Sequence, residues 1–233
     1  MAPFVLLASL VAQSSVSSDI TLWSAGSNKK WKETNDPVMG GRSTGSFKIL
    51  GNGNLQFTGE VVNVPKLKAP GFIKVETKLV GGFHWGRFHF GGTGGFDDIS
   101  SCNAIVITAR TGAPFNGYRL SFGTKHNYKC SFFSSGFKTH FELPPSTDFQ
   151  KVQLPFHTFS SCNSDSTGEP KKTCAAHSSA CPDKGTLRDV KTIGIWAEGA
   201  AGKVQLEVKS IAATGCTASG MVVVKGRNLR EGH

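Results

Sequence analysis

Residues 203–211 read KVQLEVKSI, a run in which apolar and polar side chains alternate up to a slip of register near Ser210. Its apolar members are Val204, Leu206, Val208 and Ile211. Successive side chains of a strand point to opposite faces of a sheet, so this pattern predicts a strand with one buried and one solvent-facing side.

Nine further short segments of strand-like composition lie between clusters of Gly, Pro, Asn and Ser, and the 28 glycines mark turns and bulges. They are residues 20–23, 44–49, 55–62, 71–79, 104–110, 118–123, 128–133, 150–154 and 192–197. No segment of helical length keeps an apolar i, i+3, i+4, i+7 pattern. The sequence therefore predicts an all-β fold, an antiparallel β-sandwich or jelly roll.

The length of 233 residues and the hydrophobic content of 38% suit one domain with one core, which we place at residues 19–213. Phe4–Ala12 is an apolar run of nine residues followed by small and polar ones. The run is too short to cross a bilayer and lacks the Arg of a mitochondrial presequence, so residues 1–18 are predicted to be a signal peptide. Residues 214–233 end in a polar stretch and are predicted to be a loose tail. We therefore expect a protein of the secretory pathway, extracellular or in an organelle lumen, without a transmembrane segment.

Six cysteines follow this leader: Cys102, Cys130, Cys162, Cys174, Cys181 and Cys216. An even number of cysteines in an exported chain indicates disulfides. Three of the six lie in residues 160–185, a stretch rich in Ser, Lys, Pro and Cys that we interpret as a disulfide-clamped surface insertion. If all six pair, at least one bridge must tie this insertion to the body of the domain, because three is an odd number. A zinc site is the alternative, but there is no CxxC pair and no standard ligand spacing around His177.

The net charge of +10 and the sequence pI of about 9.4 favour acidic partners, such as anionic polysaccharides, acidic protein surfaces or lipid head groups. The basic residues are scattered and no helix-turn-helix, zinc-finger or RNP pattern is present, so nucleic acid is not an expected partner. The 16 carboxylates are dispersed, and no Gly-x-Ser-x-Gly motif occurs. These features predict a protein that is not an enzyme and that has no metal or cofactor.

Residues 83–90 (FHWGRFHF) combine four aromatic side chains with two histidines and one arginine. As a single strand, they would place Trp85, Arg87 and His89 on one face. Such a face suits a sugar ring or a protein hot spot, which makes Trp85 and Arg87 candidate binding residues. The alternative is a core strand with Trp85 at its rim. An active site based on histidine is a third hypothesis, but a single strand would put His84 and His89 on opposite faces.

Tyr118 and Arg119 belong to a predicted strand that is followed by Lys125, His126 and Lys129. We interpret Tyr118 and Arg119 as partner-binding residues in a basic patch around this hairpin. The alternative is that the basic side chains only discourage edge-to-edge aggregation.

Residues 31–45 read WKETNDPVMGGRSTG, the most distinctive stretch of the chain. Its Asn, Asp, Pro and Gly residues are those of tight turns, so one interpretation is a structural corner that starts the strand at Thr44. The alternative is that Asn35, Asp36 and Arg42 point into a groove and contact a partner.

This stretch resembles the signature of the complex I intermediate-associated protein 30 family. The resemblance covers about residues 22–212 and is carried by further segments: Phe57–Val61, Ala69–Phe72, Asp98–Ser100, Tyr118–Leu120, Val152–Phe156, Ile193–Ile195 and Val204–Ile211.

The resemblance implies a galactose-binding-like jelly roll, as in carbohydrate-binding modules. It also implies a non-catalytic binding role, as an assembly factor or chaperone for membrane protein complexes whose subunits would be the partners. The leader, the six cysteines and the insertion distinguish this chain from the mitochondrial members of the family. The alternative function is therefore a secreted carbohydrate-binding module whose ligands are glycans.

Overall fold

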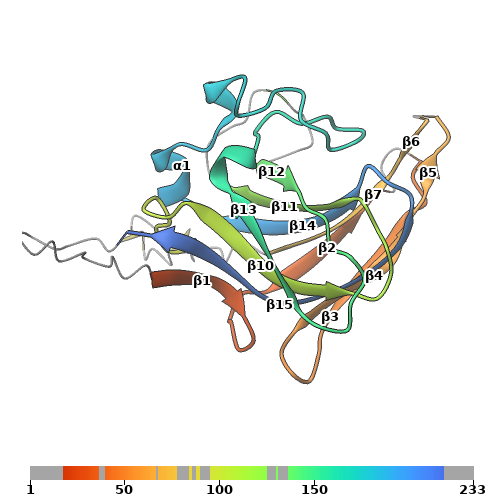
Figure 1. Cartoon of the computed structure of the whole chain (residues 1–233), viewed down its shortest axis with the longest axis horizontal. Helices are drawn as coiled ribbons and strands as arrows, with labels where there is room; N and C mark the ends of the chain where they lie inside the picture. Colours follow the sequence, from red (N-terminus) through yellow and green to blue (C-terminus); the bar gives the residue numbers. More distant parts are fainter. Residues whose placement is uncertain are drawn as a thin grey trace, which may run out of the picture.

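The computed structural model describes residues 18–36, 40–66, 68–77, 95–124, 130 and 136–217, together with the backbone of residues 84–85 and 88–89. Two antiparallel sheets stack face to face to form the body of the domain (Figure 1). The predicted antiparallel β-sandwich is therefore confirmed.

The six-stranded sheet has the order β13-β10-β15-β4-β3, with β1 also pairing with β15. Its strands are β1 (Ser18–Ser24), β3 (Thr44–Ile49), β4 (Leu55–Val61), β10 (Ala104–Thr111), β13 (Gln150–Pro155) and β15 (Gly202–Cys216). The long strand β15 organises this sheet, because its first half pairs with β4 and its second half with β1. The register shift opposite Ser210 in the pairing of β10 with β15 confirms the slip that the sequence of β15 predicts.

The five-stranded sheet has the order β12-β11-β14-β7-β2. Its strands are β2 (Trp31–Asn35), β7 (Phe72–Thr77), β11 (Tyr118–Gly123), β12 (Phe137–His140) and β14 (Thr192–Glu198). Two short hairpins lie outside the main sheets, β5 (Asn63–Val64) with β6 (Ala69–Pro70) and β8 (His84–Trp85) with β9 (Phe88–His89). The β5–β6 hairpin marks one end of the sandwich (Figure 1).

The core lies between the two sheets and is filled by side chains that alternate along the central strands. The six-stranded sheet contributes Leu55, Phe57, Ile105, Ile107, Leu206 and Val208, and the five-stranded sheet contributes Ile73, Val75, Leu120, Phe122, Ile193 and Ile195. Each of these side chains is at most 1% exposed. Burying one side chain of this size stabilises a fold by about 1.5–3 kcal/mol, so the predicted alternation accounts for the stacking of the sheets.

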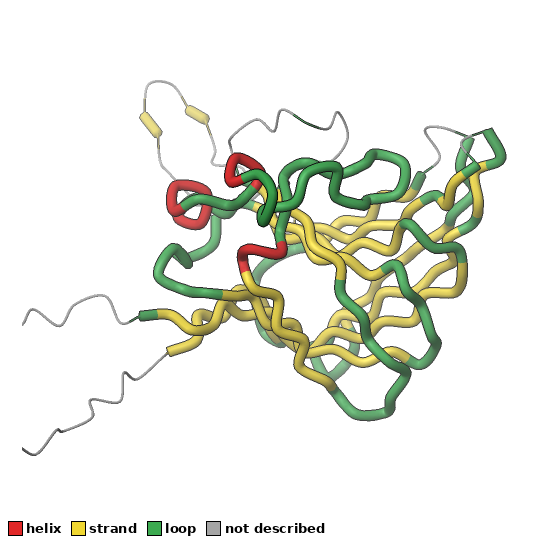
Figure 2. The backbone as a smooth tube through the Cα atoms, turned by 45° about the horizontal axis from the view of Figure 1, so that its top comes forward, coloured by secondary structure: helices red, strands yellow, loops and turns green. Residues whose placement is uncertain are grey.

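The insertion at residues 160–185 lies beside the five-stranded sheet, where Ser160 forms a bridge with Lys138 of β12. Helical segments are short: η2 (Phe156–Thr158), η3 (Ser178–Ala180) and α1 (Lys184–Arg188). They gather at one end of the sandwich (Figure 2). The N-terminus of α1 is capped by Asp183, whose Oδ1 accepts a hydrogen bond from the Thr186 amide at 2.7 Å. In the part of the chain that the structure describes, no helix is long and apolar enough to cross a membrane.

Several boundaries differ from the sequence-based expectations. Strands β2 and β12 and helix α1 were not expected, since each is short and has few apolar residues. The strand predicted at 128–133 lies outside the described residues, apart from Cys130. Residues 214–216, predicted to belong to a loose tail, are part of β15, which continues to Cys216, and residues 218–233 lie outside the described residues. Ser18, the last residue of the predicted signal peptide, is the first residue of β1, and the rest of that segment lies outside the described residues.

Candidate functional site

All six cysteines form disulfides: Cys102–Cys216, Cys130–Cys162 and Cys174–Cys181. The expected bridge between insertion and body is Cys130–Cys162, and Cys174–Cys181 closes a loop within the insertion. The predicted disulfide clamp is therefore confirmed. Three disulfides suggest an oxidising compartment.

Asp36, at the end of β2, is 5% exposed and holds three segments together. Its Oδ1 accepts a hydrogen bond from the Ser43 amide at 3.0 Å, and its Oδ2 accepts from the Ser43 hydroxyl at 3.0 Å and the Phe72 amide at 3.1 Å. Ser43 Oγ in turn accepts a hydrogen bond from the Val62 amide at 3.1 Å. One carboxylate thus connects the end of β2, the segment before β3 and the start of β7.

Glycines make room for this carboxylate. A Cβ atom at Gly41 would lie 2.2 Å from Asp36 Cγ, and one at Gly71 would lie 1.5 Å from Asp36 Oδ2. Both distances are far below van der Waals contact, so neither position admits a side chain without displacing Asp36. The glycines of the motif therefore have a packing role.

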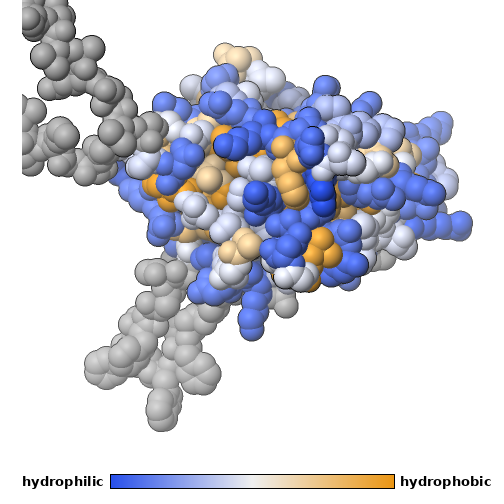
Figure 3. Space-filling model, turned by 60° about the horizontal axis from the view of Figure 1, so that its bottom comes forward, coloured by the Kyte–Doolittle hydropathy of each residue, from blue (hydrophilic) through white to orange (hydrophobic). Residues whose placement is uncertain are grey.

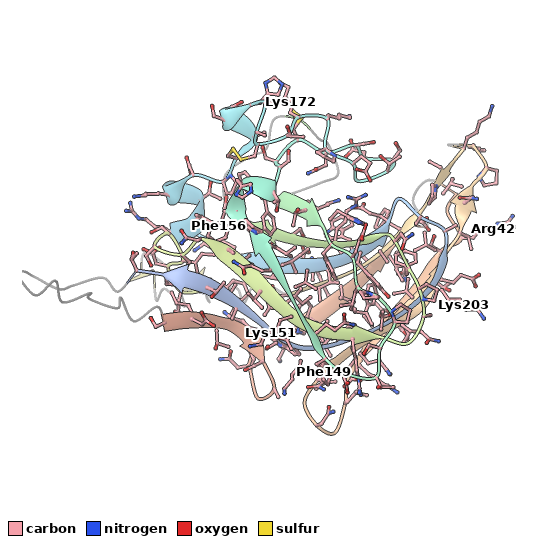
Figure 4. The ribbon with its side chains drawn as sticks, viewed as in Figure 1. Arg42, Phe149, Lys151, Phe156, Lys172 and Lys203 are labelled. Carbon is pink, nitrogen blue, oxygen red and sulfur yellow. A yellow bond between two sulfur atoms is a disulfide. The ribbon has the colours of Figure 1, made fainter. Side chains whose placement is uncertain are left out.

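The structure thus assigns Asn35 and Asp36 to the corner that starts β3. Asn35 Nδ2 donates a hydrogen bond to the carbonyl of Gly45 at 3.2 Å, and Asp36 is buried, so the alternative in which both side chains reach into a partner groove is not observed. Arg42 is exposed and projects from the molecule at the end where β5 and β6 lie (Figure 4). It stays a candidate contact residue.

Tyr118 and Arg119 do not lie on an exposed patch, which corrects the interpretation of these two residues. Tyr118 is 0% exposed and its ring stacks on Phe141 in the core, with 5.6 Å between centroids. Arg119 is 2% exposed, and its Nη2 donates hydrogen bonds to Thr167 O at 3.2 Å and to Glu169 Oε1 at 2.5 Å. The strand is buried on both faces because the insertion contacts its outer side.

Beside Arg119, the outer face of the five-stranded sheet carries a buried cluster of charges around Trp196. Lys138 Nζ lies 3.8 Å from the centroid of the Trp196 ring and donates a hydrogen bond to Glu198 Oε1 at 2.6 Å. Lys74 Nζ lies 4.5 Å from the same ring. Burial lowers the pKa of Lys138, and the charge of Glu198 opposes that shift. These side chains are paired with one another, and sequence patterns gave no sign of the cluster because its members come from separate strands.

Two short paired strands, β8 and β9, are found within the aromatic segment where one strand was expected. His84 and His89 are paired residues of β8 and β9, so the expectation of a single strand through both is wrong. The side chain of Trp85 and the whole of Arg87 lie outside the described residues, and both stay predicted contact residues. Among the described residues, no group of three or more His, Cys, Asp or Glu side chains is arranged to hold a metal ion.

An open cleft of about 460 Å³, lined mainly by residues with polar side chains, lies on the outer face of the six-stranded sheet, where no sequence pattern pointed to a site. It is lined by Gln56, Thr58, Arg110, Gly112, Ser146, Thr147, Gln205, Leu206 and Glu207. We call it the sheet cleft. The side of the molecule that carries β1 and β3 is largely hydrophilic with small apolar areas (Figure 3).

One wall of the sheet cleft is an ordered ion pair. Arg110 Nε and Nη2 donate to Glu207 Oε2 at 2.9 and 2.7 Å, and Asn54 Nδ2 donates to Glu207 Oε1 at 2.6 Å. Partial burial alone would raise the pKa of Glu207, but the hydrogen bonds from Asn54 and Arg110 outweigh it and lower that pKa. The guanidinium also lies over the Phe149 ring, 4.6 Å from its centroid. The wall is therefore rigid and electrically almost neutral.

Taken together, these elements define a two-sheet antiparallel β-sandwich domain. The chain belongs to the complex I intermediate-associated protein 30 (CIA30) family, whose model matches residues 20–208. The match covers nearly all of the described strands, and the resemblance stated from the sequence is confirmed. A search of curated proteins found no match.

Two solved structures show the same fold at low sequence identity. One is a family 11 carbohydrate-binding module from Clostridium thermocellum in complex with a β-1,3-1,4-mixed-linked tetrasaccharide, with a TM-score of 0.51 and 13% identity over 88% of this chain and 99% of the other. The other is the family 11 module of the cellulosomal cellulase Lic26A-Cel5E of the same organism, with a TM-score of 0.50 and 13% identity over 86% of this chain and 95% of the other. The expected jelly roll of the carbohydrate-binding-module type is thus confirmed as a fold.

Proposed function

We propose that this chain is a non-catalytic binding module that assists the assembly or stability of a membrane protein complex. The observation that carries the proposal is the family match over residues 20–208, a range that includes strands of both sheets. What the chain shares with the family is therefore the complete sandwich, and not one local motif.

The position of the charged side chains supports a binding role. Lys138 and Arg119 each form an ion pair with Glu198, and Arg119 also pairs with Glu169 of the insertion, so these contacts fix the positions of the charged side chains. Catalysis needs titratable groups that converge on a reacting atom in an accessible cleft. The buried cluster instead fastens the insertion to the five-stranded sheet.

The partner surface that we propose is exposed and basic. With a net charge of +10, the chain attracts acidic protein surfaces over about one Debye length, roughly 8 Å at physiological salt. Arg42, Trp85 and Arg87 are the proposed contact residues, and the proposed compartment is the secretory pathway.

Affinity purification of the tagged full chain from its native compartment, after mild crosslinking, tests this function. We expect the subunits of one membrane protein complex to be enriched, and Arg42→Ala and Trp85→Ala to reduce their recovery. Lys184→Ala removes an exposed charge from α1 and serves as the matched control with unchanged recovery. If no specific protein is recovered, the assembly role is wrong.

A secreted carbohydrate-binding module is a second candidate function. The specific observation in its favour is the sheet cleft, which offers amide and hydroxyl side chains on a rigid surface. A glycan array with the full chain should then show binding to defined oligosaccharides. The absence of signal across neutral and anionic glycans would eliminate this candidate.

A further inference from the structure

The floor of the sheet cleft presents hydrogen-bonding groups that the protein itself does not use. Gln56 of β4 and Gln205 of β15 lie on the outer face, since the neighbouring residues in each strand point into the core. Within the described part of the chain, neither amide side chain has a hydrogen-bond partner. Thr58, the paired residue of Gln205, adds a hydroxyl beside them, which also shares a hydrogen bond with the Ser46 hydroxyl at 3.4 Å. An array of amides and a hydroxyl is suited to the alternating donors and acceptors of sugar hydroxyls.

Gly112 keeps the cleft open. A Cβ atom at this position would lie 3.0 Å from Gln205 Oε1, closer than ordinary contact. Its φ angle is not in the left-handed region, so a larger residue would enter the cleft without straining the backbone. The cleft volume of about 460 Å³ falls within the roughly 300–1,000 Å³ of small-molecule sites.

The rim of the cleft is basic. Lys48 of β3 is the paired residue of Gln56, and Lys203 lies two residues before Gln205 on the same face of β15. Lys209 Nζ approaches the ring of Phe149 to 5.7 Å, on the side of the Arg110 wall. Figure 4 shows Phe149 at the turn before β13 and Lys203 at the start of β15.

The charge balance on this face is positive. Register places four basic side chains there, Lys48, Arg110, Lys151 and Lys203, and Lys209 lies beside the Phe149 ring. The carboxylates that β4 and β15 contribute are Glu60 and Glu207. Glu207 is neutralised by Arg110, whereas Glu60 lies opposite Lys203 in the register without an ion pair between these two described side chains. The remaining lysines surround a floor without any charged group, which is an arrangement suited to a ligand with neutral polar rings and peripheral negative charges.

We propose that the sheet cleft binds an anionic oligosaccharide, one that carries uronate or sulfate groups. The sugar hydroxyls contact Gln56, Thr58 and Gln205, while the acidic groups contact Lys203 and Lys209. This inference rests on the second candidate function and specifies its ligand class.

The test measures binding of the full, disulfide-bonded chain by calorimetry to three probes: a heparin hexasaccharide, a hexamer of galacturonate and the neutral cellohexaose. We expect one or both anionic probes to bind at least tenfold more tightly than cellohexaose, with affinity that falls as salt increases. Gly112→Leu fills the cleft without changing the charge and should weaken the binding of the anionic probes at least tenfold.

A double variant on the rim separates a specific site from general attraction. Lys203→Ala with Lys209→Ala should weaken anionic binding about tenfold, and both positions are exposed, so the variant is expected to fold. Lys171→Ala with Lys172→Ala removes the same charge from the exposed insertion and should change affinity less than twofold.

Equal losses in the two double variants would overturn the inference, since binding would then depend on net charge alone. Binding of cellohexaose as tight as that of the anionic probes would also overturn it, yet would leave the carbohydrate-binding function standing. If none of the three probes binds and a broader glycan array is silent, both the inference and that candidate function fall.

Discussion

Replacing Asp36 tests whether this residue holds the fold or contacts a partner. Its carboxylate accepts three hydrogen bonds, two from backbone amides and one from the Ser43 hydroxyl, at 3.0–3.1 Å. A hydrogen bond to a charged group contributes about 1.5–3 kcal/mol, and each buried donor left without a partner costs about 1–3 kcal/mol. Asp36→Ala leaves the amides of Ser43 and Phe72 without their acceptor, so we expect a loss of about 3–5 kcal/mol in the free energy of unfolding.

Asp36→Asn should cost less, about 2–3 kcal/mol, because one acceptor oxygen is kept while the amide group faces a donor. Urea unfolding at pH 7, followed by tryptophan fluorescence with the disulfides intact, measures both changes. Glu60→Ala removes an exposed carboxylate from β4 and is the matched control, with an expected change within about 0.5 kcal/mol.

Two outcomes would contradict the structural role of Asp36. If Asp36→Ala lowers the free energy of unfolding by less than about 1 kcal/mol, the three hydrogen bonds do not hold the corner. If Asp36→Asn also abolishes partner recovery at unchanged stability, the residue acts as a contact and the partner-groove alternative is restored.

Three further measurements follow from the same structure. Gly71→Ala would place a Cβ atom 1.5 Å from a carboxylate oxygen and should destabilise by at least about 2 kcal/mol, whereas Gly51→Ala, with open space around it, should stay within about 1 kcal/mol in urea unfolding. Cys102→Ser with Cys216→Ser removes a disulfide across a sequence separation of 114 and should lower the free energy of unfolding, measured by calorimetry, by roughly 2–5 kcal/mol. This loss should exceed that on removing the short Cys174–Cys181 disulfide within the insertion. Equal losses would contradict the dependence on loop length. Burial lowers the pKa of His140, so the unfolded chain binds a proton more readily than the folded chain, and the free energy of unfolding falls as pH drops below about 6.5. The urea midpoint should therefore decrease between pH 7 and 5. The decrease should be smaller in His140→Gln.

The sequence predicted the parts of the fold that alternation specifies. Strand β15 was predicted with its register slip, because Val204, Leu206 and Val208 repeat with a period of two and all point into the core. Strand β2 was missed because its sequence, WKETN, has one apolar side chain that is buried, Trp31. An alternation with a period of two cannot be recognised from a single apolar residue. Such a strand forms because it pairs with a neighbouring strand of the sheet.

The structural role of Asp36 could be predicted only in part from the turn-forming residues around it. Asn, Asp and Gly residues at 35–45 predicted a corner, since these residue types satisfy local backbone groups. The hydrogen bond to the Phe72 amide could not be predicted in this way, because the two residues are 36 positions apart. The sheet cleft was missed for the same reason, as its lining comes from β4, β10, β15 and two loops that no short motif connects.

The burial of Arg119 could not be predicted from the alternation of side chains alone. Successive side chains of β11 alternate between faces, so Arg119 lies opposite Tyr118, but which face meets solvent depends on what covers the sheet. The insertion has few large apolar side chains and cannot attach itself by hydrophobic burial. It is attached instead by the disulfide to Cys130, the bridge to β12 and the pair between Arg119 and Glu169. Arg119 is 2% exposed but Glu169 is 66% exposed, so solvent screens this pair and it stabilises less than a fully buried pair would. The charge on the outer face of β11 still favours attachment of the insertion, even though it contributes nothing to the core.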